Sequence, residues 1–285
     1  MKGVIVRFVH VLLFAAALCF ADRTGVPGYN EPAGVRGTYT VVGTYSPGLS
    51  SSYGLAIQSD VENSIWIANY STLLNNEFDM ATGGATGTTW AISSGVDPDD
   101  QGYCEYPSTP SQFFFGHWAS SMIAVYDASD TQPTAWHKLN LSGPAAWGHV
   151  CGVDAGHGNI YASDFFTDQI AWAPYTGVET SVTWTTASFA TVSGMSVYGD
   201  YLFVCTQNPG VDNIFIFQLN ADGSPDMTPV WSCVFTEDAD GPNGGIDFDG
   251  EYLWVYPQNG NLFKLEIDFE LGLQSDTWGS IKTAL

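Results

Sequence analysis

Residues 244–268, GGIDFDGEYLWVYPQNGNLFKLEID, alternate short apolar runs with polar turns. Apolar runs of this length, bounded by Gly, Asn and Asp, indicate β-strands joined by tight turns. The order is a glycine, an apolar strand, an Asp-Gly turn and a second strand rich in aromatic residues, followed by another turn and strand. The stretch therefore predicts one antiparallel unit, and the fold depends on whether this unit recurs.

The same order recurs along the chain. Glycine-led units begin at Gly54, Gly152, Gly194 and Gly245. A fifth begins at Gly95, where GVDPDD is separated from QFFFGHW by an insertion that runs through Cys104 to Pro110. Each unit continues with a third strand and a tryptophan-containing fourth strand, and four strands in roughly 45 residues are typical of a propeller blade. The sequence predicts an all-β chain with a single five-bladed β-propeller of four-stranded blades.

The last unit lacks its fourth strand at the C-terminal end. The segment GTYTVVGTYS, residues 37–46, stands before Gly54 as VTWTTASFATVS stands before Gly194. An N-terminal strand that completes the final blade closes the ring and leaves no open sheet edge between the first and last blades. We therefore expect residues 37–46 to pair with NLFKLEI, residues 261–267.

The chain divides into four predicted parts. Residues 1–21 carry Lys2 and Arg7 before an apolar run and end in small residues, as a secretory signal peptide does. The other parts are an extended N-terminal arm at 22–36, the propeller at 37–267 and a C-terminal tail at 268–285. No later apolar run reaches the roughly 18 residues of a transmembrane segment. The sequence predicts a secreted protein, extracellular or at the cell surface, with the periplasm as a further possibility.

The chain is strongly acidic, with 30 Asp and Glu residues against 7 Lys and Arg and a net charge of −23. This charge repels phosphates and anionic lipid surfaces, so nucleic acid is excluded as a partner. It is compatible with a surface that holds divalent cations, and equally with solubility alone.

Four cysteines follow the predicted leader, and an exported compartment would permit disulfides between them. They are Cys104, Cys151, Cys205 and Cys233. Four cysteines allow three full pairings, and their spacing does not match a zinc site. Cys205 and Cys233 are predicted on the second and fourth strands of one blade, about 10 Å apart, which is beyond the roughly 7 Å reach of a disulfide. We expect these two not to be bonded to each other.

The unit GIDFDGEYLWVY, residues 245–256, resembles the blade consensus of secreted propellers with NHL repeats, YVTN-type surface-layer propellers and the SMP-30/gluconolactonase family. The resemblance covers most of the mature chain and implies a fold more than an activity. DADGPNGGIDFDG, residues 238–250, is similar to the part of SMP-30-like lactonases in which an asparagine before a strand binds the catalytic metal. By that resemblance Asn243 would be a metal ligand. The other units have no matching asparagine, and that family has six blades.

First strands line the central channel of a propeller, so the third residue of each is a candidate channel residue. These residues are Ala56, Asp97, Asp154, Ser196 and Asp247. Three carboxylates directed to one axis repel one another unless a cation or protons intervene. Hard oxygen ligands favour calcium or another divalent cation, with Asn243 as a fourth ligand. Alternatively, each Asp caps its own turn.

Aromatic residues make up 14% of the chain, and aromatic side chains expected in loops are candidates for a ligand-binding face. The candidates are Tyr103, Tyr106, Trp118 and Trp147, together with His149. No nucleophile elbow, phosphate loop or zinc-protease motif is present in the sequence. We therefore expect an exported, non-catalytic propeller that binds a glycan or a surface protein. One alternative is a metal-dependent hydrolase resembling a lactonase at the channel mouth. Another is a surface-layer or filament subunit that self-associates through its terminal segments.

Overall fold

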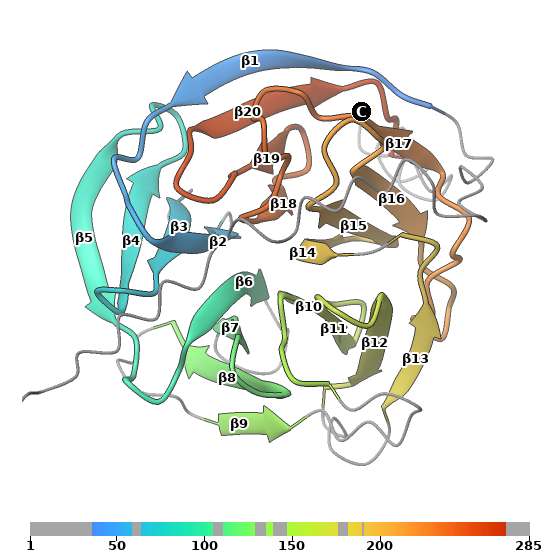
Figure 1. The fold of residues 1–285 in the computed structure, drawn as a ribbon, viewed down its shortest axis with the longest axis horizontal. Helices are drawn as coiled ribbons and strands as arrows, with labels where there is room; N and C mark the ends of the chain where they lie inside the picture. The colour runs from blue at the N-terminus through green and yellow to red at the C-terminus, as the bar shows by residue number, and fades with distance from the viewer. Residues whose placement is uncertain are drawn as a thin grey trace, which may run out of the picture. The chain divides into compact units, whose positions relative to one another are not determined.

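The structure is a computed structural model that describes residues 36–58, 64–104, 111–128, 135–138, 147–175, 182–189 and 191–271. These ranges belong to a compact unit spanning residues 32–285. Their strands form five four-stranded antiparallel sheets arranged around a centre, which is a five-bladed β-propeller (Figure 1). The all-β fold class and the number of blades predicted from the sequence are confirmed. No helix in the described part of the chain has the length and apolar character needed to cross a bilayer.

Each blade runs from an inner strand near the centre to an outer strand at the rim. The first blade contains β2 (Ser52–Gln58), β3 (Ser64–Asn69), β4 (Leu74–Asp79) and β5 (Ala85–Ala91). The second contains β6 (Pro98–Cys104), β7 (Gln112–His117), β8 (Met122–Asp127) and β9 (Ala135–Lys138). The third contains β10 (Gly152–Gly156), β11 (Asn159–Asp164), β12 (Gln169–Pro174) and β13 (Thr183–Thr186). The fourth contains β14 (Val192–Tyr198), β15 (Tyr201–Thr206), β16 (Ile214–Gln218) and β17 (Trp231–Cys233).

The fifth blade combines the two ends of the propeller. It contains β18 (Ile246–Phe248), β19 (Leu253–Val255), β20 (Leu262–Ile267) and, at its rim, β1 (Tyr39–Tyr45). β1 runs antiparallel to β20, with Tyr39 opposite Ile267 and Tyr45 opposite Leu262 (Figure 1). This pairing confirms that the N-terminal strand closes the ring.

Asp268 holds the start of this closing strand. Its Oδ1 accepts hydrogen bonds from the Thr38 backbone N–H at 2.8 Å and from the Trp231 indole N–H at 2.7 Å, and its Oδ2 accepts one from the Thr38 hydroxyl at 2.9 Å. These hydrogen bonds lower the pKa of Asp268, the contact with Trp231 most of all. Because Trp231 lies on β17, Asp268 links the closing strand to the fourth blade as well as to its own.

The core lies between neighbouring sheets, whose apolar faces pack against each other. Between the fourth and fifth blades, for example, Phe203 stacks on Phe248 with ring centroids 4.8 Å apart, and Ile246 and Val255 are fully buried. Strands buried on both faces explain why middle strands of the blades, such as β15 and β16, read as nearly continuous apolar runs. The propeller is therefore stabilised mainly by apolar burial between blades.

Small residues allow the inner strands to approach closely at the centre. A Cβ on Gly54 would lie 2.6 Å from the Gln101 backbone nitrogen, and one on Gly194 would lie 2.9 Å from the Cα of Gly245. Gly54 also has a φ of 75°, which favours glycine. The Asp100 backbone lies against Gly54. Asp100 therefore occupies, in the second blade, the position that glycine occupies in the other units.

This register corrects the predicted start of the second blade. β6 begins at Pro98, so Gly95 and Asp97 precede the inner strand instead of opening it. The residue two places after the unit glycine is Gly102 in this blade, where Asp97 was expected. The unit was misplaced because GVD at 95–97 matches the other units, whereas the true position carries Asp100.

Cys205 on β15 and Cys233 on β17 both pair with Ile214, from opposite sides of β16. A whole strand lies between them, as predicted. Cys151, Cys205 and Cys233 are buried free thiols in this structure. The predicted leader, most of the arm at 22–36, Tyr106 and residues 272–285 of the tail lie outside the described residues.

Candidate ligand-binding site

Two of the predicted channel carboxylates lie on inner strands, as expected, and each ties neighbouring blades together. Asp247 on β18 accepts hydrogen bonds from the Ile57 backbone N–H at 2.6 Å and from the Ser196 hydroxyl at 2.5 Å. Asp154 on β10 accepts one from the Val197 backbone N–H at 2.6 Å. These bonds cross from one inner strand to another, so the two carboxyl groups fasten the centre of the ring.

Asp100 on β6 also accepts hydrogen bonds from the inner strands of other blades, although the sequence analysis did not identify it. Its Oδ2 accepts hydrogen bonds from the backbone N–H groups of Val153 at 3.0 Å and Met195 at 3.3 Å. Burial raises the pKa of Asp100 and of Asp154 well above the ordinary value of 3.8, and that of Asp247 to about 7. For Asp154 the charge of Asp247 adds to the effect of burial. The protonated form of these carboxyl groups is thus favoured inside the ring.

The other two predicted cation ligands, Asp97 and Asn243, do not lie on the inner strands with Asp154 and Asp247. Asp97 precedes β6, and Asn243 Oδ1 accepts a hydrogen bond from the Gln258 backbone N–H at 2.7 Å. Among the described residues, no group of three or more His, Cys, Asp or Glu side chains is arranged to hold a metal ion. A divalent-cation site at Asp97, Asp154, Asp247 and Asn243 stays a prediction.

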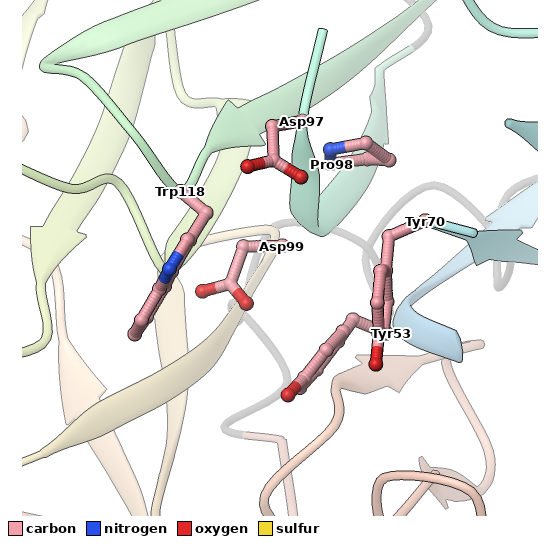
Figure 2. A pocket seen from close by; sticks show the side chains of 6 residues that line it. All are labelled: Tyr53, Tyr70, Asp97, Pro98, Asp99 and Trp118. Atoms are coloured by element: carbon pink, nitrogen blue, oxygen red, sulfur yellow. The ribbon is translucent and has the colours of Figure 1, made fainter. Parts of the chain in front are cut away.

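A pocket of about 300 Å³ lies between the first and second blades, and we call it the Trp118 pocket (Figure 2). Its lining residues are Tyr53, Tyr70, Asp97, Pro98, Asp99 and Trp118. They come from the starts of the inner strands β2 and β6 and from the residues that follow β3 and β7. The pocket therefore opens at the end of the ring where the inner strands begin.

Aromatic rings stand on two sides of the Trp118 pocket. Figure 2 shows Trp118 on one side of the two carboxyl groups, and Tyr53 with Tyr70 on the other. The Tyr53 and Tyr70 rings are 5.2 Å apart, and the Gln258 amide donates a hydrogen bond to the Tyr53 hydroxyl. The Trp118 backbone N–H donates to the Asp97 carbonyl at 2.9 Å, which fixes the tryptophan beside the pocket. The walls are thus held in place by contacts within the chain.

Two carboxyl groups with different surroundings lie between these walls. The Asp99 residue is only 7% exposed, and burial raises its pKa to about 7, with a further increase from Asp97. A hydrogen bond with the Cys151 thiol partly offsets this increase. Asp97 is more exposed than Asp99. The pocket therefore combines one solvent-accessible carboxylate with one buried carboxyl group that titrates near neutral pH.

An aromatic cluster continues from Trp118 across the surface, and we call it the Phe166 patch. It consists of His149, Phe165 and Phe166, whose rings lie 4.6, 6.1 and 6.0 Å from Trp118. Phe166 is 59% exposed. Asp164 orders both loops of the patch, because its carboxylate accepts hydrogen bonds from the backbone N–H groups of His149 at 3.3 Å and Phe166 at 2.8 Å.

The structure separates the residues predicted for the ligand-binding face. Trp118 lines the pocket, and His149 lies beside it. Tyr103 and Trp147 are instead buried in the cores between blades, so their predicted place on an exposed face is wrong. Tyr103 belongs to β6, and the Trp147 indole donates to Gln169 at 2.8 Å.

Sequence reasoning missed four residues of the pocket, one of which, Pro98, is the first residue of β6. Tyr53 and Asp99 lie at the second position of an inner strand, and Tyr70 directly follows β3, in SYG, DPDD and NYS. A polar aromatic residue at the start of an inner strand and another directly after the next strand was a usable signal, because both ends meet at the same edge of an antiparallel pair.

No known family model matches this sequence, and no curated protein matches it. Solved structures do resemble the fold. A glutaminyl cyclase from Myxococcus xanthus is 9% identical, with 82% of this chain and 98% of that chain covered and a TM-score of 0.55. The nidogen/laminin complex is 14% identical, covers 76% of this chain and 85% of that chain, and has a TM-score of 0.48. A virginiamycin B lyase from Staphylococcus aureus is 14% identical and has a TM-score of 0.45, and the match covers 76% of this chain and 66% of that chain. At 9% identity, the likeness to the glutaminyl cyclase is one of fold alone.

Proposed function

We propose that this chain is an extracellular carbohydrate-binding β-propeller whose Trp118 pocket receives one sugar unit. The observation that carries the proposal is the combination, in one pocket of about 300 Å³, of three aromatic side chains with two carboxyl groups. That volume is at the lower end of the range for ligand pockets, and it suits a small unit of a larger chain. The export signal predicted at residues 1–21 supports a site of action outside the cell.

Each part of the pocket has a role in binding a sugar. Sugar rings present C–H groups that pack on aromatic faces, for which Trp118 and Tyr53 are available. Carboxylates accept hydrogen bonds from hydroxyl groups, and bonds to a charged acceptor are stronger than those between neutral groups. The internal contacts of Tyr53 and Trp118 reduce the entropy lost when a ligand orders the site.

The charge of the pocket restricts the class of glycan. Asp97 and Asp99 lie together in a chain with a net charge of −23. Glycans with carboxylate or sulfate groups would be repelled from this site. We expect neutral or basic glycans to bind and acidic glycans to be rejected.

A glycan array with the secreted form of the protein tests the proposal, followed by calorimetric titration of the glycans that bind. Trp118→Ala should weaken binding about ten-fold or more, because it removes a stacking surface. Tyr198→Ala is the matched control, since Tyr198 is also an exposed aromatic residue but lies at the far end of an inner strand. The absence of any glycan ligand, or unchanged binding by Trp118→Ala, would overturn the proposal.

A second candidate function, hydrolysis in the same pocket, is favoured by the contrast between Asp97 and Asp99. A carboxyl group that titrates near neutral pH beside a more exposed carboxylate suits acid–base chemistry. A panel of lactones, esters and glycosides, assayed with and without calcium, tests this function. Turnover that Asp99→Asn abolishes would replace the binding proposal, whereas lack of turnover over the whole panel would remove the hydrolase from consideration.

A further inference from the structure

The Trp118 pocket has negative groups but no positive group among its lining residues. Besides Asp97 and Asp99, the described residues that line it are Pro98 and three aromatic residues. The titratable groups whose charges act on Asp99 or hydrogen-bond to it are Asp97, Asp100, Cys151 and Tyr53, which come from β2, β6 and the residues before β6 and β10. None of these groups can carry a positive charge. No lining residue therefore balances the charge of the two carboxyl groups, and a cationic group on a ligand would do so.

We infer that the sugar unit bound in the Trp118 pocket is an amino sugar with a free amino group. The inference rests on the proposed carbohydrate function and specifies its ligand. The ammonium group would lie between Asp97 and Asp99, and the ring would lie against Trp118 or the two tyrosines. The charges of the ligand and of the pocket are then complementary.

Two properties of the pocket favour an ammonium group over a hydroxyl group. An ammonium group has three N–H donors and a positive charge, so it can donate to both carboxylates at once. Attraction between opposite charges is stronger in a partly buried site than in water. The aromatic walls add to this attraction, because the face of Trp or Tyr attracts a cation. A hydroxyl or an N-acetyl group in the same place would leave two carboxyl groups without a balancing charge.

Calorimetric titration with three hexamers that share a β-1,4-linked glucose backbone tests the inference. Their units are glucosamine, N-acetylglucosamine and glucose. The pH is about 6, because the oxygen atoms beside a sugar amine lower its pKa below that of an ordinary alkylamine. We expect the glucosamine hexamer to bind at least about ten-fold more tightly than the others.

Variants show whether these carboxyl groups are responsible. Asp97→Asn and Asp99→Asn should each weaken binding of the glucosamine hexamer about ten-fold or more. Asn keeps the shape of the side chain, and tryptophan fluorescence checks that each variant is folded. Asp240→Asn is the control, because it removes the same charge from an exposed position outside the pocket.

The outcomes separate this inference from the proposed function. Equal binding of the N-acetylated or the glucose hexamer would overturn the amino-sugar inference and leave carbohydrate binding in place. Binding of the glucosamine hexamer that Asp97→Asn and Asp99→Asn leave unchanged would also overturn it. If none of the three hexamers binds, the inference fails, and the glycan array decides the carbohydrate proposal separately.

Discussion

Replacing Asp99 with Asn should remove part of the pH dependence of the protein's stability. Burial raises the pKa of Asp99 from its ordinary value of 3.8 to about 7 in the folded protein. The folded state therefore holds a proton at this site over a pH range in which the unfolded chain has released it. Stability falls with pH where the folded state binds more protons. The stabilisation is fully present below the unfolded pKa and is lost as the pH rises through about 7.

The size of the effect follows from the two pKa values. A shift of about 3 units corresponds to roughly 4 kcal/mol in total. About 2.5 kcal/mol of this falls between pH of about 5 and about 8, because the folded group ionises inside that window. Asn cannot ionise and keeps an acceptor for the Cys151 thiol. The parent protein should therefore lose about 2.5 kcal/mol more than Asp99→Asn over this range.

Urea unfolding at a series of pH values and constant ionic strength measures this difference. The chain contains 10 tryptophans, so their fluorescence reports unfolding. Linear extrapolation gives the free energy of unfolding at each pH, provided that its slope with urea stays constant. Asp240→Asn, which changes the net charge equally at an exposed site, should keep the pH dependence of the parent. If the parent and Asp99→Asn lose the same stability, the carboxyl group of Asp99 is not protonated by burial.

Three further predictions concern the ring. Gly54→Ala should destabilise the protein by roughly 1–3 kcal/mol or more, because its Cβ would lie 2.6 Å from the Gln101 backbone nitrogen at a φ of 75°. Thermal unfolding of both variants measures this difference. Gly148→Ala is the control and should be nearly neutral, because a Cβ at Gly148 would meet open space. Deletion of residues 37–46 should abolish cooperative unfolding, whereas deletion of residues 22–36 should leave it almost unchanged, and a reversed order in calorimetry would contradict the closure by β1. Finally, calcium bound at the predicted site of Asp97, Asp154, Asp247 and Asn243 should raise the melting temperature, and a chelator should lower it. Equal melting curves with calcium and with chelator would contradict the prediction of a cation site.

The number of blades and the closure of the ring could be predicted because their signals are local. A glycine, a strand, a turn and a second strand recur within a few tens of residues, and the missing strand of the last unit is visible as a surplus at the N-terminus. The start of the second blade was misplaced for the same reason. Asp100 occupies the glycine position there, and a local pattern at 95–97 imitates the unit.

The site was harder to predict because it is built from two blades. Trp118 was identified as an aromatic residue in a loop, but Tyr53 and Tyr70 reach the same pocket only once the first and second blades stand side by side. Trp147 was misjudged for a related reason. A propeller packs aromatic side chains between blades close to the ends of its strands, so an aromatic residue near a predicted loop can belong to the core.

The pairing of β1 with β20 also sets the order of events during folding. The strand that completes the fifth blade is synthesised before the other four blades, and its partner at Leu262–Ile267 after them. β1 must remain without its native partner until nearly the whole propeller has been synthesised, and contacts of such high sequence separation slow folding. An unpaired strand can meanwhile add to the sheet of another molecule, so a nascent chain that stalls before β20 is exposed to strand exchange with its neighbours.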